Sequence, residues 1–140
     1  MNSPQSEAVK PSRAPQQLPA RVASVLLRAR ASERVATGTN RRRAWQLTRE
    51  LIQATLSAGY PATLIADALG VTSGTIRNRA GGSGFLDAGE LLELADLSSA
   101  ILDHWQINGL LPRTRIDGFD RRMYAAEDII LGLARQGSIP

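Results

Sequence analysis

The stretch ATLIADALGVTSGTIRNR, residues 62–79, decides how this chain folds. Two short helices that cross steeply need a small side chain where their axes approach, a turn residue that tolerates positive φ, and apolar side chains that hold them together. Ala66 meets the first need and Gly70 meets the second. The third is met by Leu69, Val71 and Ile76. The stretch therefore predicts a helix over 62–69 and, after a cap at Thr72, a second helix over 73–79.

The residues before this stretch extend it to a three-helix unit over 37–80. Apolar residues recur at helical spacing from 41 to 58, which predicts an amphipathic helix that Asn40 caps and in which Trp45 is a core anchor. Residues 20–36 predict a basic helix or an extended basic arm. Residues 1–19 are rich in proline and poor in large apolar side chains, so we expect a disordered tail.

Over residues 41–80 this pattern resembles the DNA-binding domains of the homeodomain-like and Hin-recombinase type. The resemblance implies that the helix over 73–79 enters the major groove. The side chains suit this role independently, because Arg can bond guanine in a bidentate manner and Asn can bond adenine in the same way. The expected groove contacts are Ser73, Gly74, Thr75, Arg77 and Asn78, with Thr72 and Arg79 near phosphates.

Arg41, Arg42 and Arg43 form a second feature of this half. Cations in the first turn of a helix oppose the positive end of its dipole, which costs a few tenths to about 1 kcal/mol each. A phosphate backbone or a narrow minor groove would compensate, and homeodomain-like proteins reach the minor groove with a basic arm at this place. The alternative is a solvated helix start with no ligand.

Residues 85–140 predict a second domain behind the glycine-rich stretch 81–84, which is interpreted as a linker. Asp87 is placed to cap a helix through Ala95, and Ser98 to cap another that reaches Asn108. The chain then alternates polar and apolar residues over 112–124, which predicts a hairpin turning at Asp117 and Gly118. A last helix is expected over 125–135, and Trp105 is a second expected core anchor.

The order of short motifs over 85–135 resembles the winged helix-turn-helix of MerR-type regulators. The motifs are Gly89-Glu90-Leu91, Leu97-Ser98, Gly109-Leu110-Leu111-Pro112, Gly118-Phe119, Arg122-Met123-Tyr124 and Glu127-Asp128-Ile129. The chain has Asp103 before His104 and Trp105 where the family usually has an Arg before aromatic residues. The resemblance implies DNA contacts from the hairpin wing and the edge of the recognition helix, or else an acidic face that binds another protein. The residues for the first interpretation are Ser99, His104, Gln106, Arg113, Arg115, Arg121 and Arg122.

Charge and composition narrow the range of functions. Residues 1–84 hold 12 basic and 4 acidic side chains, whereas residues 85–140 hold 5 basic and 9 acidic ones, so the net charges are +8 and −4. A basic half indicates a polyanionic partner, most commonly nucleic acid. With no Cys and a single His, the sequence predicts no metal site, no cofactor and no enzymatic reaction. It also predicts no membrane segment, and hence a soluble intracellular protein. The resemblance to small phage regulators implies the bacterial cytoplasm, in association with the nucleoid.

The sequence thus predicts a mainly α protein with two tandem helix-turn-helix domains, the second with a small β-hairpin wing. The expected function is sequence-specific binding of double-stranded DNA as a transcriptional repressor that occupies its operator, in the manner of small phage regulators. The expected form is a monomer on an asymmetric site, with a homodimer as the alternative, and no small-molecule ligand is evident. The other functions considered are an excisionase-like DNA-bending protein and an adaptor whose acidic half binds a protein partner.

Overall fold

The computed structural model describes residues 17–137, a part of the chain that is mainly helical and carries a small antiparallel sheet. The sheet has three strands in the order β1-β3-β2. The first half contains α1 (Ala20–Val35), α2 (Gly38–Ser57), α3 (Ala62–Leu69) and α4 (Ser73–Arg79). The second half contains β1 (Phe85–Asp87), α5 (Ala88–Ala95), α6 (Ser99–Ile107), β2 (Thr114–Ile116), β3 (Arg122–Ala125) and α7 (Ala126–Gly137).

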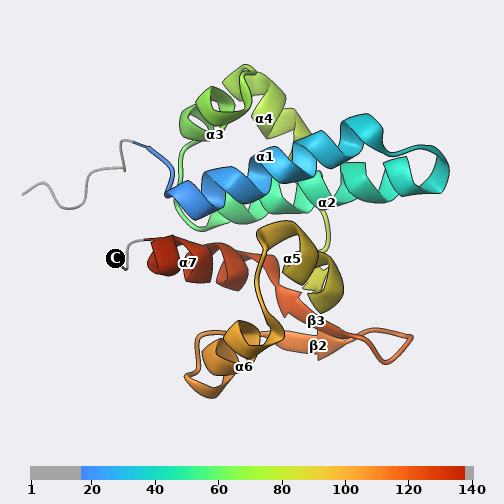
Figure 1. Cartoon of the computed structure of the whole chain (residues 1–140). Coiled ribbons are helices and arrows are strands. Elements are labelled where there is room, and N and C mark those ends of the chain that lie inside the picture. Colours follow the sequence, from blue (N-terminus) through green and yellow to red (C-terminus); the bar gives the residue numbers. More distant parts are fainter. Residues whose placement is uncertain (1–16, 138–140) are drawn as a thin grey trace, which may run out of the picture.

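The two long helices α1 and α2 form an antiparallel hairpin that lies across the middle of the molecule (Figure 1). Helices α3 and α4 lie on one side of this hairpin, and α5 and α7 pack against its other side. The sequence predicted either a helix or an extended arm for residues 20–36, and the structure shows a helix. Its apolar face is fully buried, with Val22, Val25, Leu26 and Ala29 all at most 1% exposed.

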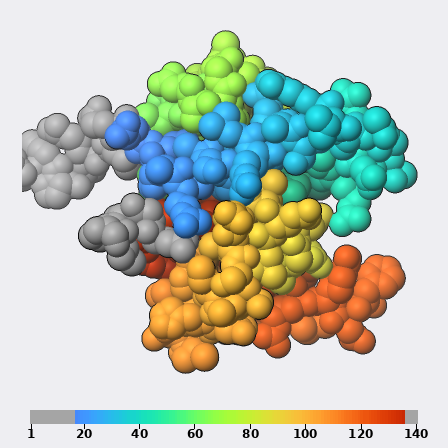
Figure 2. Space-filling view, in the orientation of Figure 1, coloured from blue at the N-terminus to red at the C-terminus, as the bar shows by residue number. Residues whose placement is uncertain are grey.

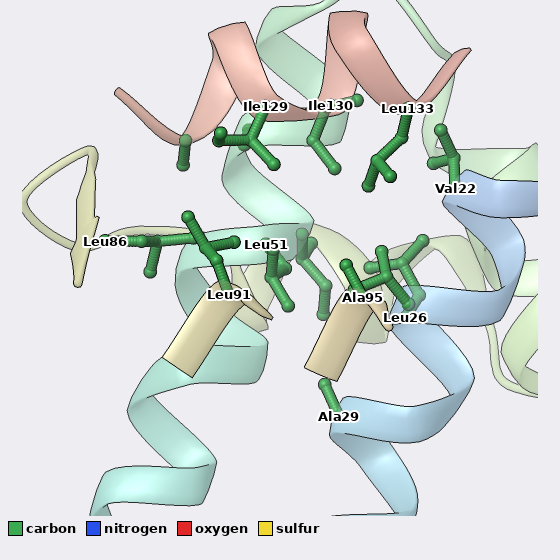
Figure 3. Close-up of a cluster of buried hydrophobic side chains, with 14 of the residues drawn as sticks. Val22, Leu26, Ala29, Leu51, Leu86, Leu91, Ala95, Ile129, Ile130 and Leu133 are labelled. Atoms are coloured by element: carbon green, nitrogen blue, oxygen red, sulfur yellow. The ribbon is translucent and has the colours of Figure 1, made fainter. Parts of the chain in front are cut away.

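A single hydrophobic core joins the two halves of the chain. Leu26 of α1 and Leu51 of α2 meet Leu91 of α5 and Ile130 of α7, and all four side chains are completely buried (Figure 3). Apolar burial of this kind stabilises by roughly 1.5 to 3 kcal/mol per large side chain. The second half is therefore held on the first by packing and not only by the chain between them.

The glycine-rich stretch 81–84, predicted to be a linker, lies against α2. The carboxylate of Glu50 is buried and accepts hydrogen bonds from the Gly84 N–H (2.8 Å) and the Ser83 hydroxyl (3.2 Å). A buried carboxylate is costly unless it is hydrogen-bonded, so these contacts tie the stretch to α2. At Gly82, with φ of +111°, an added Cβ would come within 2.6 Å of the Glu50 carboxyl carbon. Glycine at this position therefore allows both the positive φ and the close approach of the backbone to the Glu50 side chain.

The stretch 62–79 folds as its sequence predicts. Gly70 has φ of 70° and closes α3, and the Val71 N–H donates to the Ala66 carbonyl at 3.0 Å. Thr72 caps α4, because its hydroxyl oxygen accepts from the Thr75 N–H at 3.1 Å. Ala66 and Ile76 are buried between the two helices.

Two predictions for α2 are wrong. The helix begins at Gly38 after Thr37, so Asn40 lies inside its first turn and is not the cap. Arg42 and Arg43 consequently lie beyond the first turn, where the dipole acts on them less strongly. Trp45 is not a core anchor, because 40% of it is exposed.

In the second half both predicted caps are confirmed, since Asp87 caps α5 and Ser98 caps α6. The sequence does not predict the strand β1, because three residues are too few to show an alternation of apolar and polar side chains. It pairs antiparallel with β3, and Phe85 lies opposite Ala125, so α7 begins one residue later than expected. Trp105 is 7% exposed, which confirms it as a core anchor.

Helix α7 approaches Trp105 most closely at Gly132, where an added Cβ would lie 2.7 Å from the indole ring. We expect Gly132→Ala to lower the free energy of unfolding by about 1 to 3 kcal/mol through overpacking, although alanine normally favours helices. Gly74→Ala in α4 is the matched control, since its nearest neighbour would be 3.9 Å away; it should be neutral or stabilising by up to about 1 kcal/mol. Urea unfolding of both variants measures the difference, and equal effects would contradict the close approach.

Candidate nucleic-acid interface

Helix α4 presents one face to the α3 helix and the opposite face to solvent. Ile76 is buried, whereas Gly74, Thr75, Arg77 and Asn78 are exposed and Ser73 is half-buried. This follows from helical periodicity, because the residues on either side of Ile76 must point away from the core. All five residues predicted to meet base edges therefore lie on α4, and four of them are exposed.

Thr72 and Arg79, both predicted to contact phosphate, are engaged within the protein. Thr72 caps the helix, and its hydroxyl also lies 2.9 Å from that of Thr75. The Arg79 guanidinium donates to Glu33 of α1 (3.3 Å) and to the Trp45 carbonyl of α2 (3.1 Å). It also lies 4.9 Å from the centre of the Trp45 ring, so Arg79 fixes α4 on the α1–α2 hairpin. Its Nε is buried and has no acceptor.

Among the described residues, five arginines have no hydrogen-bond, ion-pair or ring partner. Every one of them belongs to the first half of the chain. One, Arg77, projects from α4, and three others lie where the ends of α1 and α2 meet. They are Arg21, Arg34, Arg41, Arg42 and Arg77.

The unpartnered arginines at the end of the hairpin line a surface cavity of about 790 Å³. The cavity lies between the last turns of α1, the first turns of α2 and the end of α4. Trp45 and the carboxylate of Glu33 also line it. We call it the arginine pocket, after its arginines Arg30, Arg34, Arg41, Arg42 and Arg79.

The arginine triplet of α2 is divided between two surfaces. Arg41 and Arg42 line the arginine pocket, whereas Arg43 donates to Glu90 of α5 at 3.0 Å. Both groups of this pair are partly exposed, so the pair contributes at most about 1 kcal/mol. Arg43 thus faces the second half of the molecule rather than the pocket beside α4.

The four arginines of the predicted wing all have intramolecular partners. Arg113 pairs with the buried Asp128 of α7, and this hydrogen bond raises the pKa of the Arg113 guanidinium. Arg121 pairs with Asp117 at 3.0 Å and with Asp87 at 3.7 Å. The other two make weaker contacts, Arg122 with the Gln106 amide oxygen at 3.2 Å and Arg115 with the Phe85 ring at 4.3 Å.

The polar residues of α6 are mostly exposed, but no unpartnered arginine among the described residues lies near them. Ser99 and His104 are exposed, and Gln106 is half-buried. Among the described acids, those without partners are Asp67 in the first half and four in the second, Glu93, Asp96, Asp103 and Asp120. Helix α6 and the β2–β3 hairpin lie at the opposite end of the molecule from α3 and α4 (Figures 1 and 2). The structure therefore separates the predicted contacts of α4 from those of α6. Arg42 and Arg43 of α2, by contrast, line a cavity of about 490 Å³ together with Arg121 of the predicted wing.

Comparisons with known protein families, characterised proteins and solved structures found no match to this chain. No helix within residues 17–137 is long and apolar enough to cross a membrane. The same residues contain no group of three His, Asp or Glu side chains that could hold a metal ion.

The loop between β2 and β3 depends on the charge of Asp117. Hydrogen bonds from the Arg121 and Phe119 N–H groups and from the Arg121 side chain hold the pKa of the Asp117 carboxyl below its usual value. A lowered pKa means that the ionised form stabilises the loop above the usual Asp pKa of about 3.9 and loses this effect as the pH falls through the lowered value.

In an NMR titration we expect the Asp117 carboxyl and the Phe119 and Arg121 amides to share one midpoint below the usual Asp value. Asp117→Asn should abolish this titration at both amides. A midpoint at or above the usual value would contradict the hydrogen bonding of the loop.

Proposed function

We propose that this protein is a sequence-specific, double-stranded DNA-binding regulator that reads its site with α4. The observation that carries the proposal is the distribution of unpartnered arginines. Four of the five lie on α4 or in the arginine pocket beside it, at one end of the molecule. Side chains that have no partner within the protein are available to neutralise a polyanion.

In this proposal α3 and α4 form a helix-turn-helix unit with α4 in the major groove. Arg77 would pair with guanine and Asn78 with adenine, while Gly74 allows the backbone to approach the bases closely. The rigid support for α4 comes from the buried Ile76 and from the contacts of Arg79 with Glu33 and Trp45. Specific recognition needs such support, because base contacts require fixed geometry.

The arginines at the end of the α1–α2 hairpin supply the part of the affinity that does not depend on sequence. Arg34, Arg41 and Arg42 are exposed and adjacent to α4, so they can meet the phosphate backbone on one flank of the groove. Binding in this way would exclude polymerase from an operator, which is repression by occupancy. The small phage repressors that the sequence resembles are the proposed functional class.

Substitutions separate the two kinds of contact. We expect Arg77→Ala and Asn78→Ala each to cost about 1 to 3 kcal/mol on the preferred duplex and to relax sequence choice. Arg42→Ala should weaken binding to all sequences and reduce the salt slope by about 1. Fluorescence anisotropy with a duplex selected from a random pool, and with a scrambled duplex, gives both quantities. Equal losses on the two duplexes for all three variants would refute the assignment of roles.

A second candidate function is DNA bending, with α5, α6 and the β2–β3 hairpin acting as a MerR-like winged helix. The opposite placement of α4 and α6 favours it over simultaneous reading of a straight duplex (Figure 1). One duplex could contact both ends only by curving around the molecule. The unpartnered acids near α6 favour instead a protein partner for this end.

Surface substitutions test this candidate better than truncation, since removing residues 85–140 would take α7 out of the shared core. With α4 as the sole reader, we expect Arg115→Ala and His104→Ala to change DNA affinity less than twofold. Circularly permuted fragments should then show no position-dependent mobility. Losses above about tenfold together with such mobility would establish bending and overturn reading by α4 alone.

A further inference from the structure

The residues that line the arginine pocket form two levels that differ in exposure. Its rim is exposed and consists of Arg34, Arg41, Arg42 and Trp45. Its floor is half-buried and includes Arg30, Glu33 and Arg79. A duplex that lies across α4 would meet the rim with its convex backbone and leave the floor unfilled.

The charge in the pocket is strongly unbalanced. Five guanidinium groups face a cavity of about 790 Å³ that contains one carboxylate, and Arg79 already holds that carboxylate. Guanidinium is the group best suited to bind planar or tetrahedral oxyanions through paired N–H donors. The volume lies within the range of roughly 300 to 1,000 Å³ that is typical of small-ligand sites.

The donors on the floor are incompletely used. Arg30 makes one long hydrogen bond, of 3.4 Å, to the Leu69 carbonyl at the end of α3. Arg79 leaves Nε buried without an acceptor. Because the Arg79 Nε is enclosed by the protein, an anion on the floor would be met by Arg30, whose single hydrogen bond is long.

We infer that the arginine pocket binds a compact anion with two adjoining phosphate groups, either free pyrophosphate or the diphosphate of a nucleotide. Two linked phosphates offer more oxygen acceptors over a longer span than a single phosphate, so they can pair with more of these guanidiniums. The two helices of the hairpin and α4 each contribute donors, so the ligand would also fix α4 on the hairpin. This inference goes beyond the proposed function, and its ligand competes with the duplex for Arg34, Arg41 and Arg42.

Calorimetry of the full chain without DNA and without Mg²⁺ tests the inference at about 0.1 M salt, where distant charges are screened. The probes are inorganic pyrophosphate, orthophosphate, ADP and adenosine. We expect pyrophosphate to bind at least about tenfold more tightly than orthophosphate, since it engages guanidiniums at both levels of the pocket. Tighter binding of ADP than of pyrophosphate would assign the ligand to nucleotides, and equal binding would assign it to free pyrophosphate.

Three variants provide the controls. Arg34→Gln and Arg42→Gln alter exposed rim residues that have no partner among residues 17–137, so they should fold normally and each weaken pyrophosphate binding at least about fivefold. Arg77→Gln removes an equally exposed charge outside the pocket and should leave pyrophosphate binding unchanged. Equal affinity for pyrophosphate and orthophosphate, or equal losses in all three variants, would overturn the inference.

The same variants keep this inference distinct from the proposed function. If Arg77→Gln no longer discriminates between duplexes and pyrophosphate fails to bind, α4 reads DNA and the pocket arginines contact only the DNA phosphate backbone. If pyrophosphate binds as expected and no duplex is discriminated, the pocket is an anion site and the DNA proposal fails.

Discussion

The structure depends on the burial of the two long helices α1 and α2 between α3 and α4 on one side and α5 and α7 on the other. Leu26 and Leu51 reach α5 and α7 on one side, while the same helices support α3 and α4 on the other. Apolar area drives this arrangement, because the chain has few aromatic residues and fills its core with Leu, Ile, Val and Ala. One core therefore positions both proposed binding surfaces, and α4 cannot move independently of α1 and α2 without disturbing that core.

The second organising feature is which arginine side chains have partners in the folded chain and which have none. In the second half Arg113 and Arg121 are paired with carboxylates, and Arg122 donates to the neutral amide oxygen of Gln106. In the first half, Arg77 of α4 and three arginines at the end of the hairpin, Arg34, Arg41 and Arg42, have no partner among the described residues. Four of the five unpartnered arginines within residues 17–137 thus lie on α4 or in the arginine pocket, which is the physical basis of the proposed DNA site and of the proposed anion site.

Local structure could be read from the sequence with good accuracy, because its signals are local. The αL turn at Gly70 and the caps at Thr72, Asp87 and Ser98 arise from backbone preferences within a few residues. The predictions failed where a distant partner decides. Trp45 is an exposed platform for Arg79, and β1 forms only because β3 is beside it. That residues 81–84 link two domains stays a prediction, and Glu50 holds this stretch against α2. Four of the five predicted groove residues of α4 are exposed, and Ser73 is half-buried. The sequence could not show that Arg79, expected near phosphate, is held by Glu33 and Trp45.

The sequence by itself determined the helices, their caps, the turn at residue 70 and the uneven charge of the two halves, since all of these follow from residue type and short-range spacing. Only the tertiary structure decided which arginines are paired, because pairing depends on what lies opposite each side chain after folding. Arg79 and Arg77 are two residues apart on one helix, yet one is held by Glu33 and Trp45 and the other has no partner within the described residues. The same packing that buried the α1–α2 hairpin brought its basic end beside α4 and created the pocket.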